Sequence, residues 1–527
     1  MEDPKAGMGV PTARLPILPH PLAASSSPEL VIGLVGPMGA DLDLVTDILK
    51  KELADVGYSS CVIRLSSLLS SIRGLSLTLI PKPEDERIHS HMKAGTEIRT
   101  RTGWADILAF LAVARIREER KARSGNSNTP VERIAYILRS LKHKSEIDSL
   151  RDVYGDGFIT ISVYSPKDRR CSDLAKVIAK SHHDTHRQKY IPRAEELINI
   201  DEEEEGTRFG QNVSAAFPLA DVFVEATSKS GLQKSIRRFI QIFFNNQFLT
   251  PTKDEFGMFQ ARAAALRSAD LSRQVGSAIM TQDGDLIALG CNDVPKAGGG
   301  MYWSDDIGPD GRDFQRGFDP SSRAKTEILA ETLGALEAAK MLAGDEPHDI
   351  PRMTESIIEG EHAEKFKALQ IANIIEFGRI VHSEMAAITN AASRGVSVKN
   401  ATLYCTVFPC HMCARLIIAS GIDRVVYIEP YPKSRTQELY DDSIIVDQVG
   451  LVRDRVNFQS FVGLAPTRYQ SLFAILKRKD SKGDVLEWDT KSALPRVRRF
   501  VPSYLYLEQK TTDALPKKFA ESGLSLS

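Results

Sequence analysis

Two short motifs, 28 residues apart, constrain the fold of this chain more than any other feature of the sequence. The first is His382-Ser383-Glu384, and the second is Pro409-Cys410-His411-Met412-Cys413. Each motif stands where an apolar helical pattern begins, and NATLYCTVF between them is typical of a strand. Proline is well placed in a first helical turn, and the helix dipole lowers thiol pKa values there. The spacing therefore fits one helix and one strand between the two motifs.

These residue types in this pattern point to zinc. His382, Cys410 and Cys413 supply three ligands of a tetrahedral ion and leave the fourth position for water. Zinc-bound water ionises near neutral pH and supplies a nucleophile, and Glu384 is placed to move its proton. His-x-Glu followed by Pro-Cys-x-x-Cys is the signature of zinc nucleobase deaminases, which attack C4 of cytosine or C6 of adenine. A structural zinc site is the alternative and needs a fourth protein ligand, whereas His411 is expected to face solvent.

The chain is long enough, at 527 residues, for two to four domains. An apolar strand pattern over Leu30–Val35, a glycine turn, a helical pattern from Asp43 and a second strand open a parallel α/β sheet. Two apolar runs around Asp283-Gly284 predict a β-hairpin. We expect these segments: 1–28, a flexible tail; 29–245, the first domain; 246–490, the domain with the zinc motifs, including an insertion at about 296–376; and 491–527, a C-terminal extension.

The charge balance favours a small substrate over a long nucleic acid. Lys+Arg is 68 against Asp+Glu 69, and the totals show no excess of base that would neutralise many phosphates. Six cysteines are too few for a disulfide scaffold of this length. No apolar run is long enough for a membrane span, and the start lacks a secretion signal. We therefore expect a cytoplasmic protein without a membrane partner.

The stretch GPMGADLD stands where a phosphate-binding loop belongs, but it is degenerate. Gly36 and Gly39 are present, whereas Ala40–Leu42 replaces the Gly-Lys-Ser/Thr ending that holds phosphate and magnesium. A working kinase is not expected. Two interpretations remain open, a nucleotide-sensing regulatory domain and a structural relic that assembles the oligomer, and both glycines also fit an ordinary tight turn. The acidic run Asp201–Glu205 predicts a solvated loop, and Arg170 is expected at the surface.

Longer stretches carry a family resemblance. RSADLSRQVGSAIMTQDGDLIALGCNDVP, HSEMAA and TLYCTVFPCHMCARLIIASGIDRVVYIEPYPKS resemble the deoxycytidylate branch of the cytidine deaminase superfamily. With the degenerate loop, GQNVSAAFPLADVFVE and FVGLAPTRYQSLF, residues 29 to 490 resemble the bacterial anti-phage dCTP deaminases, also described as antiviral cytidine deaminases. The resemblance implies a P-loop NTPase or nucleotide-kinase-like parallel sheet domain, followed by a cytidine-deaminase-like three-layer α/β/α domain.

The resemblance also implies an activity and partners. It implies zinc-dependent conversion of dCTP, and in some members dCMP, to the deoxyuridine nucleotide plus ammonia, which depletes the dCTP pool of an infecting phage. Asn292 would hold the deoxyribose hydroxyl, although an Asn after a strand also suits a turn. The resemblance also implies homo-oligomers whose activity is silent until infection. The basic Arg169-Arg170 and PRVRRF stretches could meet a triphosphate, an inhibitory RNA or another regulator, although exposed surface charge is expected at both. Two rival functions remain: a single-stranded nucleic-acid cytosine deaminase, and a regulatory nucleotide-binding protein with structural zinc.

Overall fold

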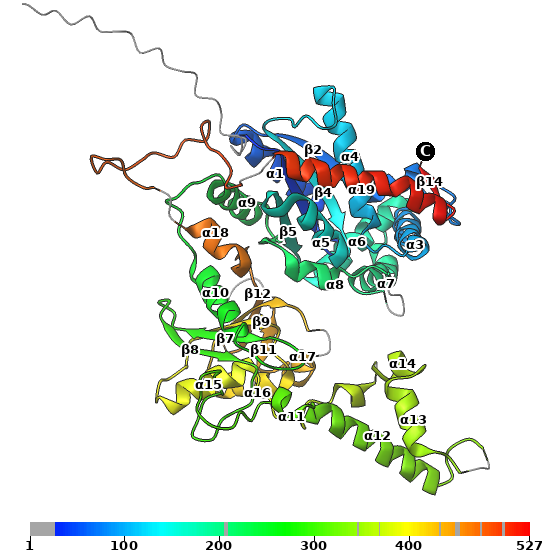
Figure 1. The fold of residues 1–527 in the computed structure, drawn as a ribbon, viewed down its shortest axis with the longest axis vertical. Coiled ribbons are helices and arrows are strands. Elements are labelled where there is room, and N and C mark those ends of the chain that lie inside the picture. The colour runs from blue at the N-terminus through cyan, green and yellow to red at the C-terminus, as the bar shows by residue number, and fades with distance from the viewer. Residues whose placement is uncertain are drawn as a thin grey trace, which may run out of the picture.

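The chain forms two α/β units and a projecting helical arm in the computed structural model (Figure 1). The structure describes residues 27–204, 209–344, 347–367, 369–431, 434–447, 454–474, 477–497 and 501–526. Residues 1–26 of the predicted tail and Glu205 of the acidic run therefore lie outside the described residues.

The first unit is built on a parallel sheet, as the sequence predicts. Its strands are β1 (Leu30–Val35), β2 (Ser59–Arg64), β4 (Ile134–Leu141), β5 (Phe158–Tyr164) and β6 (Val222–Glu225). They pair side by side in the order β6-β5-β1-β4-β2, and all of these pairings are parallel. A two-residue strand, β13 (Gly463–Leu464), adds an antiparallel edge beside β6. Parallel neighbours need crossover connections, and helices of the same unit supply them.

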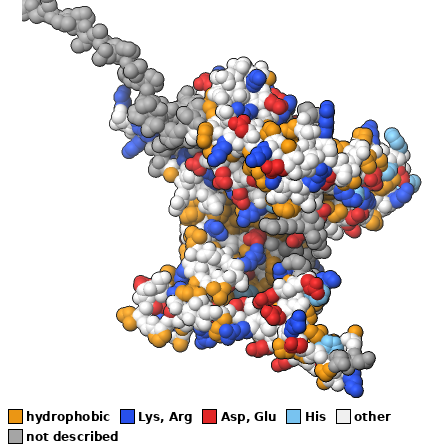
Figure 2. All heavy atoms as spheres, turned by 45° about the vertical axis from the view of Figure 1, so that its right-hand side comes forward, with side chains coloured by type: hydrophobic (Ala, Val, Ile, Leu, Met, Phe, Trp, Pro, Cys, Tyr) orange, Lys and Arg blue, Asp and Glu red, His pale blue; other side chains and the backbone are white. Residues whose placement is uncertain are grey.

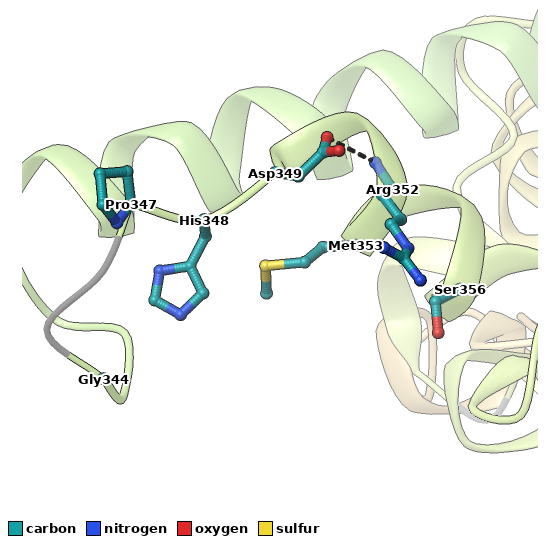
Figure 3. A pocket seen from close by; sticks show the side chains of 7 residues that line it. All are labelled: Gly344, Pro347, His348, Asp349, Arg352, Met353 and Ser356. Atoms are coloured by element: carbon teal, nitrogen blue, oxygen red, sulfur yellow. Dashed lines mark hydrogen bonds between the residues drawn. The ribbon is translucent and has the colours of Figure 1, made fainter.

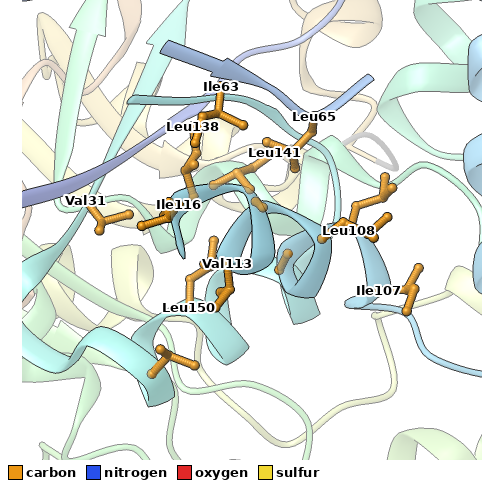
Figure 4. Packing of buried hydrophobic residues seen from close by; sticks show 14 of the residues in the cluster. Val31, Ile63, Leu65, Ile107, Leu108, Val113, Ile116, Leu138, Leu141 and Leu150 are labelled. Atoms are coloured by element: carbon orange, nitrogen blue, oxygen red, sulfur yellow. The ribbon is translucent and has the colours of Figure 1, made fainter. Parts of the chain in front are cut away.

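Helices cover both faces of this sheet. The longer ones are α1 (Leu42–Asp55), α3 (Glu84–Thr102), α4 (Ile107–Ser124), α5 (Lys144–Tyr154), α6 (Lys167–Ser181), α7 (Ile191–Glu202) and α9 (Lys229–Phe243), and the short ones are α2 (Leu65–Leu68) and α8 (Val213–Ala216). Successive residues of β1 face opposite sides, because side chains alternate along a strand. Val31 and Val35 join the core beneath α4 and α5, and Ile32 joins the core beneath α1 and α9. Figure 4 shows Val113 and Ile116 of α4 packed against that sheet.

The second unit has a mixed sheet. Its strands are β7 (Gly276–Met280), β8 (Leu286–Cys291), β9 (Thr402–Val407), β10 (Arg424–Glu429), β11 (Ile444–Val446) and β12 (Val456–Ser460). The spatial order is β11-β12-β10-β9-β7-β8, with β7 antiparallel to β8 and β9 and the other pairs parallel. The hairpin predicted at Asp283-Gly284 is confirmed, since β7 and β8 pair antiparallel, with one register shift between Ile279 and Met280, and Gly284 turns with a φ of 101°.

Helices on both faces of the mixed sheet give three layers. Leu403 and Cys405 of β9 pack in one core with α15 (Ser383–Ser393) and α16 (His411–Ala419). Tyr404, which points to the other side, packs with α10 (Lys253–Ala265). This arrangement agrees with the three-layer α/β/α expectation, and it places the starts of α15 and α16 on the same face of the sheet.

The predicted insertion forms the arm, and the C-terminal segment returns to the first unit. The arm consists of α11 (Asp313–Arg316), α12 (Pro320–Ala338), α13 (Ile350–Ile358) and α14 (Ala363–Lys367) (Figure 1). Other elements of the described residues include α17 (Thr436–Leu439), α18 (Tyr469–Phe473) and α19 (Val501–Glu521), and β3 (Ile72–Arg73) pairs with β14 (Ser525–Leu526). Helix α19 packs on α4, where Arg120 donates to both Glu508 and Glu29 at 2.6 and 2.8 Å.

Partly buried ion pairs connect the two units. Arg468, just after β13, donates to Asp221 of the first unit at 2.9 Å. Arg238 of α9 donates to both carboxylate oxygens of Glu255 in α10, at 2.7 and 2.8 Å. Leu464 also donates its backbone N–H to Glu255 at 3.0 Å. The pairing of β13 with β6 and these contacts hold the units in one arrangement.

Two further observations concern the surface. None of the helices in the described part of the chain is both long and apolar enough to cross a membrane. On the face shown in Figure 2, Lys and Arg side chains are interspersed with Asp and Glu, in keeping with the formal net charge of -1.

Candidate metal centre

The three predicted zinc ligands converge in the second unit, although they come from two helices. Cys410 Sγ lies 3.3 Å and Cys413 Sγ lies 3.4 Å from His382 Nδ1, and the two sulfur atoms are 3.6 Å apart. Among the described residues, no fourth His, Cys, Asp or Glu joins this cluster. Three candidate ligand atoms therefore face one point.

The local fold explains why the ligands meet. His382 is the residue that begins α15, and Cys410 is the residue that begins α16. Gly290 of β8 lets α15 approach the sheet, because a Cβ at that position would lie 2.1 Å from the carbonyl oxygen of Ser383. Helix starts carry a partial positive charge, which stabilises a thiolate. Close packing of α15 on β8 therefore places both helix starts side by side.

The spacing of the three atoms fits a tetrahedral zinc ion. Zinc binds sulfur at about 2.3 Å and nitrogen at about 2.0 Å, so a tetrahedral site places two sulfurs about 3.8 Å apart and a sulfur and a nitrogen about 3.5 Å apart. The observed separations, 3.6 Å and 3.3 to 3.4 Å, are slightly shorter. One histidine and two cysteines also form a common zinc ligand set. The residues present therefore fit Zn²⁺.

Proton affinities within the cluster favour a deprotonated sulfur. The hydrogen bond between the Cys410 and Cys413 sulfur atoms lowers the pKa of Cys410. Burial lowers the pKa of His382, but the bond to Cys410 together with the negative charges of Cys410, Glu384 and Asp270 outweighs burial and raises that pKa to about 9. Metal ligands must be deprotonated to bind. Cys410 is thus prepared as a thiolate ligand by its immediate neighbours.

Glu384 lies beside the cluster and is almost fully buried, with 4% of its surface exposed. Its Oε2 accepts a hydrogen bond from the Ser383 hydroxyl at 3.0 Å, and that hydroxyl lies 2.7 Å from the hydroxyl of Ser277 in β7. Burial and the negative charge of Cys410 raise the pKa of Glu384. A carboxyl group held this way can exchange a proton at the cluster.

A cavity of about 310 Å³ opens onto His382, Glu384 and Cys410. Asn292, at the end of β8, also lines it. The Asn292 amide donates to Asp270 at 3.0 Å, and its Oδ1 accepts the backbone N–H of Ser383 at 2.9 Å. Asn292 therefore both borders the cavity and fixes the first turn of α15.

Sequence reasoning missed several residues that line this cavity. The arm supplies part of the wall through the start of α12, and further residues come from loops around the site: Asp270, Arg273, Asp319, Ser321, Ser322, Lys325, Phe408 and Tyr431. The turn over residues 298–303 is not among the described residues that line the cavity; the Arg267 guanidinium lies over the ring of Trp303, 3.6 Å from its centroid. The approach of α12 depends on tertiary packing, which residue spacing does not reveal.

The degenerate loop lies in the first unit, away from this cluster. Gly39 has a φ of 86°, and a Cβ there would lie 2.6 Å from the carbonyl oxygen of Arg170, so the glycine is needed for the turn. Asp201 is fully buried and its Oδ2 accepts from the Met38 N–H at 2.7 Å and from Lys142 Nζ at 2.9 Å. The predictions of a solvated Asp201 and an exposed Arg170 are wrong, because both side chains are buried against this loop.

A second cavity, of about 530 Å³, lies on the arm (Figure 3). Its histidine, His348, is held by Glu337, whose carboxylate lies 2.7 Å from the ring nitrogen Nδ1. None of the described residues that line it is a cysteine. This cavity therefore offers no ligand set comparable to the cluster at the start of α15 and α16.

Comparison with known proteins identifies the second unit. Residues 251–429 match the family described as the cytidine and deoxycytidylate deaminase zinc-binding region. This range contains all three clustered ligand residues and Glu384. The chain thus carries a domain of the cytidine and deoxycytidylate deaminase superfamily.

Individual relatives match over parts of their length. A deoxycytidylate deaminase of Enterobacteria phage T2 is 46% identical over 55 residues, which are 10% of this chain and 29% of that protein. A probable deoxycytidylate deaminase of Drosophila melanogaster is 28% identical over 175 residues, 33% of this chain and 58% of the relative. The ComE operon protein 2 of Bacillus subtilis (strain 168) is 36% identical over 98 residues, 18% and 51% of the two chains. The chain therefore spans less than two thirds of the length of these relatives.

One solved structure similar to this chain is a dCMP deaminase from the cyanophage S-TIM5 in complex with dCMP and dUMP. It is 15% identical, with a TM-score of 0.22, and the match covers 40% of this chain and 99% of the phage chain.

Proposed function

We propose that this protein is a zinc-dependent deaminase that converts deoxycytidine nucleotides, dCTP and dCMP, to the deoxyuridine nucleotides and ammonia. One observation carries the proposal: His382, Cys410 and Cys413 present three ligand atoms to one point at the wall of a cavity, with buried Glu384 beside them. A structural zinc site would need a fourth protein ligand, and the cluster has three among the described residues.

Each residue has a distinct part in the reaction. His382, Cys410 and Cys413 would hold the ion, which when bound lowers the pKa of a water ligand to about 7 and so makes it nucleophilic. Glu384 accepts one proton from the water that adds to C4 of the cytosine and delivers it to N3, and it then carries the second proton, from the new C4 hydroxyl, to the leaving amino group. The C4–N4 bond breaks, ammonia leaves and a uracil remains. Ser383 keeps the Glu384 carboxylate in place through its hydroxyl.

The cavity wall supports a nucleotide as the substrate. Phe408 and Tyr431 supply flat aromatic surface next to Cys410, and Arg273 and Lys325 bring positive charge to the same cavity. Aromatic faces suit a pyrimidine ring, and cationic side chains suit phosphate groups. We assign the deoxyribose hydroxyl to Asn292, which lines the same cavity. Lys325 belongs to the arm, so the arm would take part in substrate recognition.

The biological role that we propose is antiviral defence in the cytoplasm, by depletion of the dCTP pool. It is supported by the resemblance of the longer sequence stretches to the anti-phage dCTP deaminases. The same resemblance supports a homo-oligomer whose activity is restrained by an inhibitory RNA or another regulator.

A substrate panel tests the proposed reaction. Zinc-loaded protein is incubated with dCTP, dCMP, dATP and a cytosine-containing single-stranded oligonucleotide, and uracil and ammonia are measured. We expect uracil from the free deoxycytidine nucleotides. Uracil from the oligonucleotide alone would replace this proposal with a nucleic-acid deaminase, and the absence of any product from zinc-loaded protein would contradict it.

A charge variant tests the substrate contact. Lys325→Gln should raise KM for dCTP while kcat stays within about twofold, because uniform binding is lost without a change in the transition state. Lys340→Gln, on the exposed end of the same arm, is the matched control and should leave both constants unchanged.

A further inference from the structure

A row of small residues crosses the mixed sheet beneath the first turn of α15. The register of the strands places Gly290 of β8 opposite Ser277 of β7, and Ser277 opposite Cys405 of β9. Ser277 and Cys405 are both completely buried. Gly290 admits the backbone of α15 to this row, because a Cβ at that position would lie 2.1 Å from the carbonyl oxygen of Ser383. The start of α15 therefore lies directly against the row.

Ser277 is a polar residue on a largely apolar face of the sheet. Side chains alternate along a strand, so Ser277 points to the same side of β7 as Ile279, which packs in one core with Leu403 and Ala387. A hydroxyl group buried in such a core is costly unless it is hydrogen-bonded. The Ser277 hydroxyl lies 2.7 Å from the hydroxyl of Ser383, which is also completely buried. The two buried hydroxyl groups therefore satisfy each other.

The number of hydrogens fixes the direction of these bonds. A serine hydroxyl has one hydrogen to donate and two lone pairs that accept. Ser383 donates its hydrogen to Glu384 Oε2 at 3.0 Å, so in the contact between the two serines Ser277 is the donor. The Cys405 thiol, 3.8 Å from Ser383 Oγ, can donate weakly to the remaining lone pair. The hydrogen bonds thus run from Ser277 through Ser383 to Glu384.

This series of bonds determines how the Glu384 carboxylate is held. A serine hydroxyl rotates to suit its partners, and the hydrogen bond from Ser277 leaves the Ser383 hydrogen directed at Glu384. Hydrogen bonds in series polarise one another, which strengthens the bond to the carboxylate. A catalytic side chain must be held to within about 0.5 Å of its productive position by the packing and hydrogen bonds behind it.

We propose that Ser277 is a positioning residue for deamination, whose hydroxyl orients the Ser383 hydroxyl and so keeps the Glu384 carboxylate aimed into the catalytic cavity. The inference rests on the proposed function, because it gives Ser277 a part in that same reaction. Glu384 lines the cavity, whereas Ser277 is not among the described residues that do so. Ser277 therefore acts on the reaction without touching the substrate.

Removing the Ser277 hydroxyl tests this role in the full-length, zinc-loaded protein, with dCTP and dCMP as substrates. Ser277→Ala should lower kcat by about tenfold and leave KM within about twofold, because the substrate contacts stay and the proton transfer is disturbed. Zinc content should equal that of the parent, since Ser277 is not part of the ligand cluster. Steady-state kinetics and metal analysis give these values.

A double variant shows whether Ser277 acts through Ser383. Ser383→Ala should lower kcat at least as far as Ser277→Ala, because it removes the bond to Glu384 itself. Ser277→Ala combined with Ser383→Ala should have the kcat of Ser383→Ala alone, since the series is already interrupted. Denaturant unfolding adds a readout that is independent of turnover. Ser383→Ala takes a partner from the buried Ser277 hydroxyl, so the double variant should be no less stable than Ser383→Ala.

Ser162→Ala is the matched control. Ser162 is a completely buried serine of β5, and its hydroxyl donates to the carbonyl oxygen of Phe217 at 2.8 Å within the first unit. The control should lose stability as Ser277→Ala does, because both lose a buried hydrogen bond. It should keep the parental kcat and KM. An equal fall of kcat in Ser162→Ala would attribute the effect to lost stability and overturn the inference.

The other outcomes separate this inference from the proposed function. Parental kcat in Ser277→Ala, with an active parent, would overturn the positioning role and leave the proposed function standing. Loss of zinc in Ser277→Ala would make Ser277 a structural residue of the metal centre instead. Effects of the two substitutions that multiply in the double variant would show that Ser277 does not act through Ser383. A parent that deaminates no deoxycytidine nucleotide would overturn the proposed function and this inference with it.

Discussion

The glycine loop of the first unit and the metal centre of the second are built at the same kind of place, where the chain passes from a strand into a helix. In the loop, the protein uses its own groups to satisfy the donors: Asp41 caps α1 and Asp201 binds the Met38 N–H. At the metal centre, three ligand atoms converge and no fourth side chain of the described residues completes the set. A strand-to-helix junction is therefore structural where a carboxylate of the protein occupies its N–H donors. A similar junction can take part in chemistry where one metal-ligand position is left without a protein side chain.

Replacing one of the three metal-ligating residues should have the largest effect on the metal centre. His382→Ala leaves two sulfur atoms, which are too few for a stable zinc site, so we expect zinc and deamination to be lost together. Zinc content and uracil formation are the two measurements. His348→Ala, on the arm, is the control and should keep both. A zinc-free His382→Ala protein with parental turnover would show that the cluster is not the catalytic centre.

Replacing Glu384, the proposed proton carrier, should lower the rate of deamination without a loss of zinc. In Glu384→Gln the amide keeps the shape of the side chain but cannot accept the proton, so kcat should fall by about 10²–10⁴-fold. Zinc content should stay at about one ion per chain, because Glu384 is not part of the ligand cluster. Glu376→Gln, whose carboxylate is half exposed near His411, should behave as the parent. Parental turnover in Glu384→Gln would reject the proposed role.

Disturbing the packing under the ligands should affect both stability and activity. A Cβ at Gly290 would lie 2.1 Å from the carbonyl oxygen of Ser383, so Gly290→Ala must push α15 away from β8. We expect a loss of about 1–3 kcal/mol in the free energy of unfolding, together with lower zinc affinity. Denaturant unfolding and a competitive zinc chelator measure the two effects. Unchanged zinc affinity would mean that the ligand geometry does not depend on this contact.

Removing the internal carboxylate should affect only the first unit. Asp201→Asn takes the charged partner from Lys142 and weakens the bond to the Met38 N–H, at a cost of about 1–3 kcal/mol. Deaminase kcat should not change, because the loop lies outside the catalytic cavity. Asp168→Asn, an exposed residue of α6, is the control. A large fall in kcat at full stability would show that the loop communicates with the metal centre.

The smallest expected effect is a pH dependence of the stability that Asp254 of α10 contributes. Burial raises the pKa of Asp254, but the bonds from Arg424, at 2.7 and 2.8 Å, outweigh it and lower the pKa. A carboxyl group whose pKa is lower in the folded chain than in the unfolded chain stabilises the fold at pH values above its unfolded pKa, which is about 3.9 for Asp. This stabilisation is lost as the pH falls through the lower pKa of the folded chain. The difference between parent and Asp254→Asn, about 1 kcal/mol at pH 6, should therefore shrink below about pH 4. A difference that grows in acid would contradict this sign.

Local signals predicted much of the fold. The apolar run Leu30–Val35 forms a central strand, and the Asp283-Gly284 turn joins two antiparallel strands. The zinc motifs were readable for the same reason, since each lies within one short segment at a helix start. These features depend on neighbours in sequence, where periodicity and turn chemistry carry the information.

Features that join distant segments were not predictable. Asp201 lies 163 residues from Met38, so the acidic run gave no sign that one of its carboxylates is buried against the glycine loop. Lys325 and Ser321 border the catalytic cavity only because α12 packs beside it. Burial of a charge is decided by the partner that it meets in the folded chain. A single sequence does not identify such partners.

The contact between α19 and α4 has a consequence for the order of assembly. Glu508 and Glu29, at opposite ends of the described chain, share the guanidinium group of Arg120. During synthesis on a ribosome, Arg120 emerges long before Glu508, and the second unit is made in between. The charge cluster on the amino-terminal sheet is therefore complete only after α19 has been made.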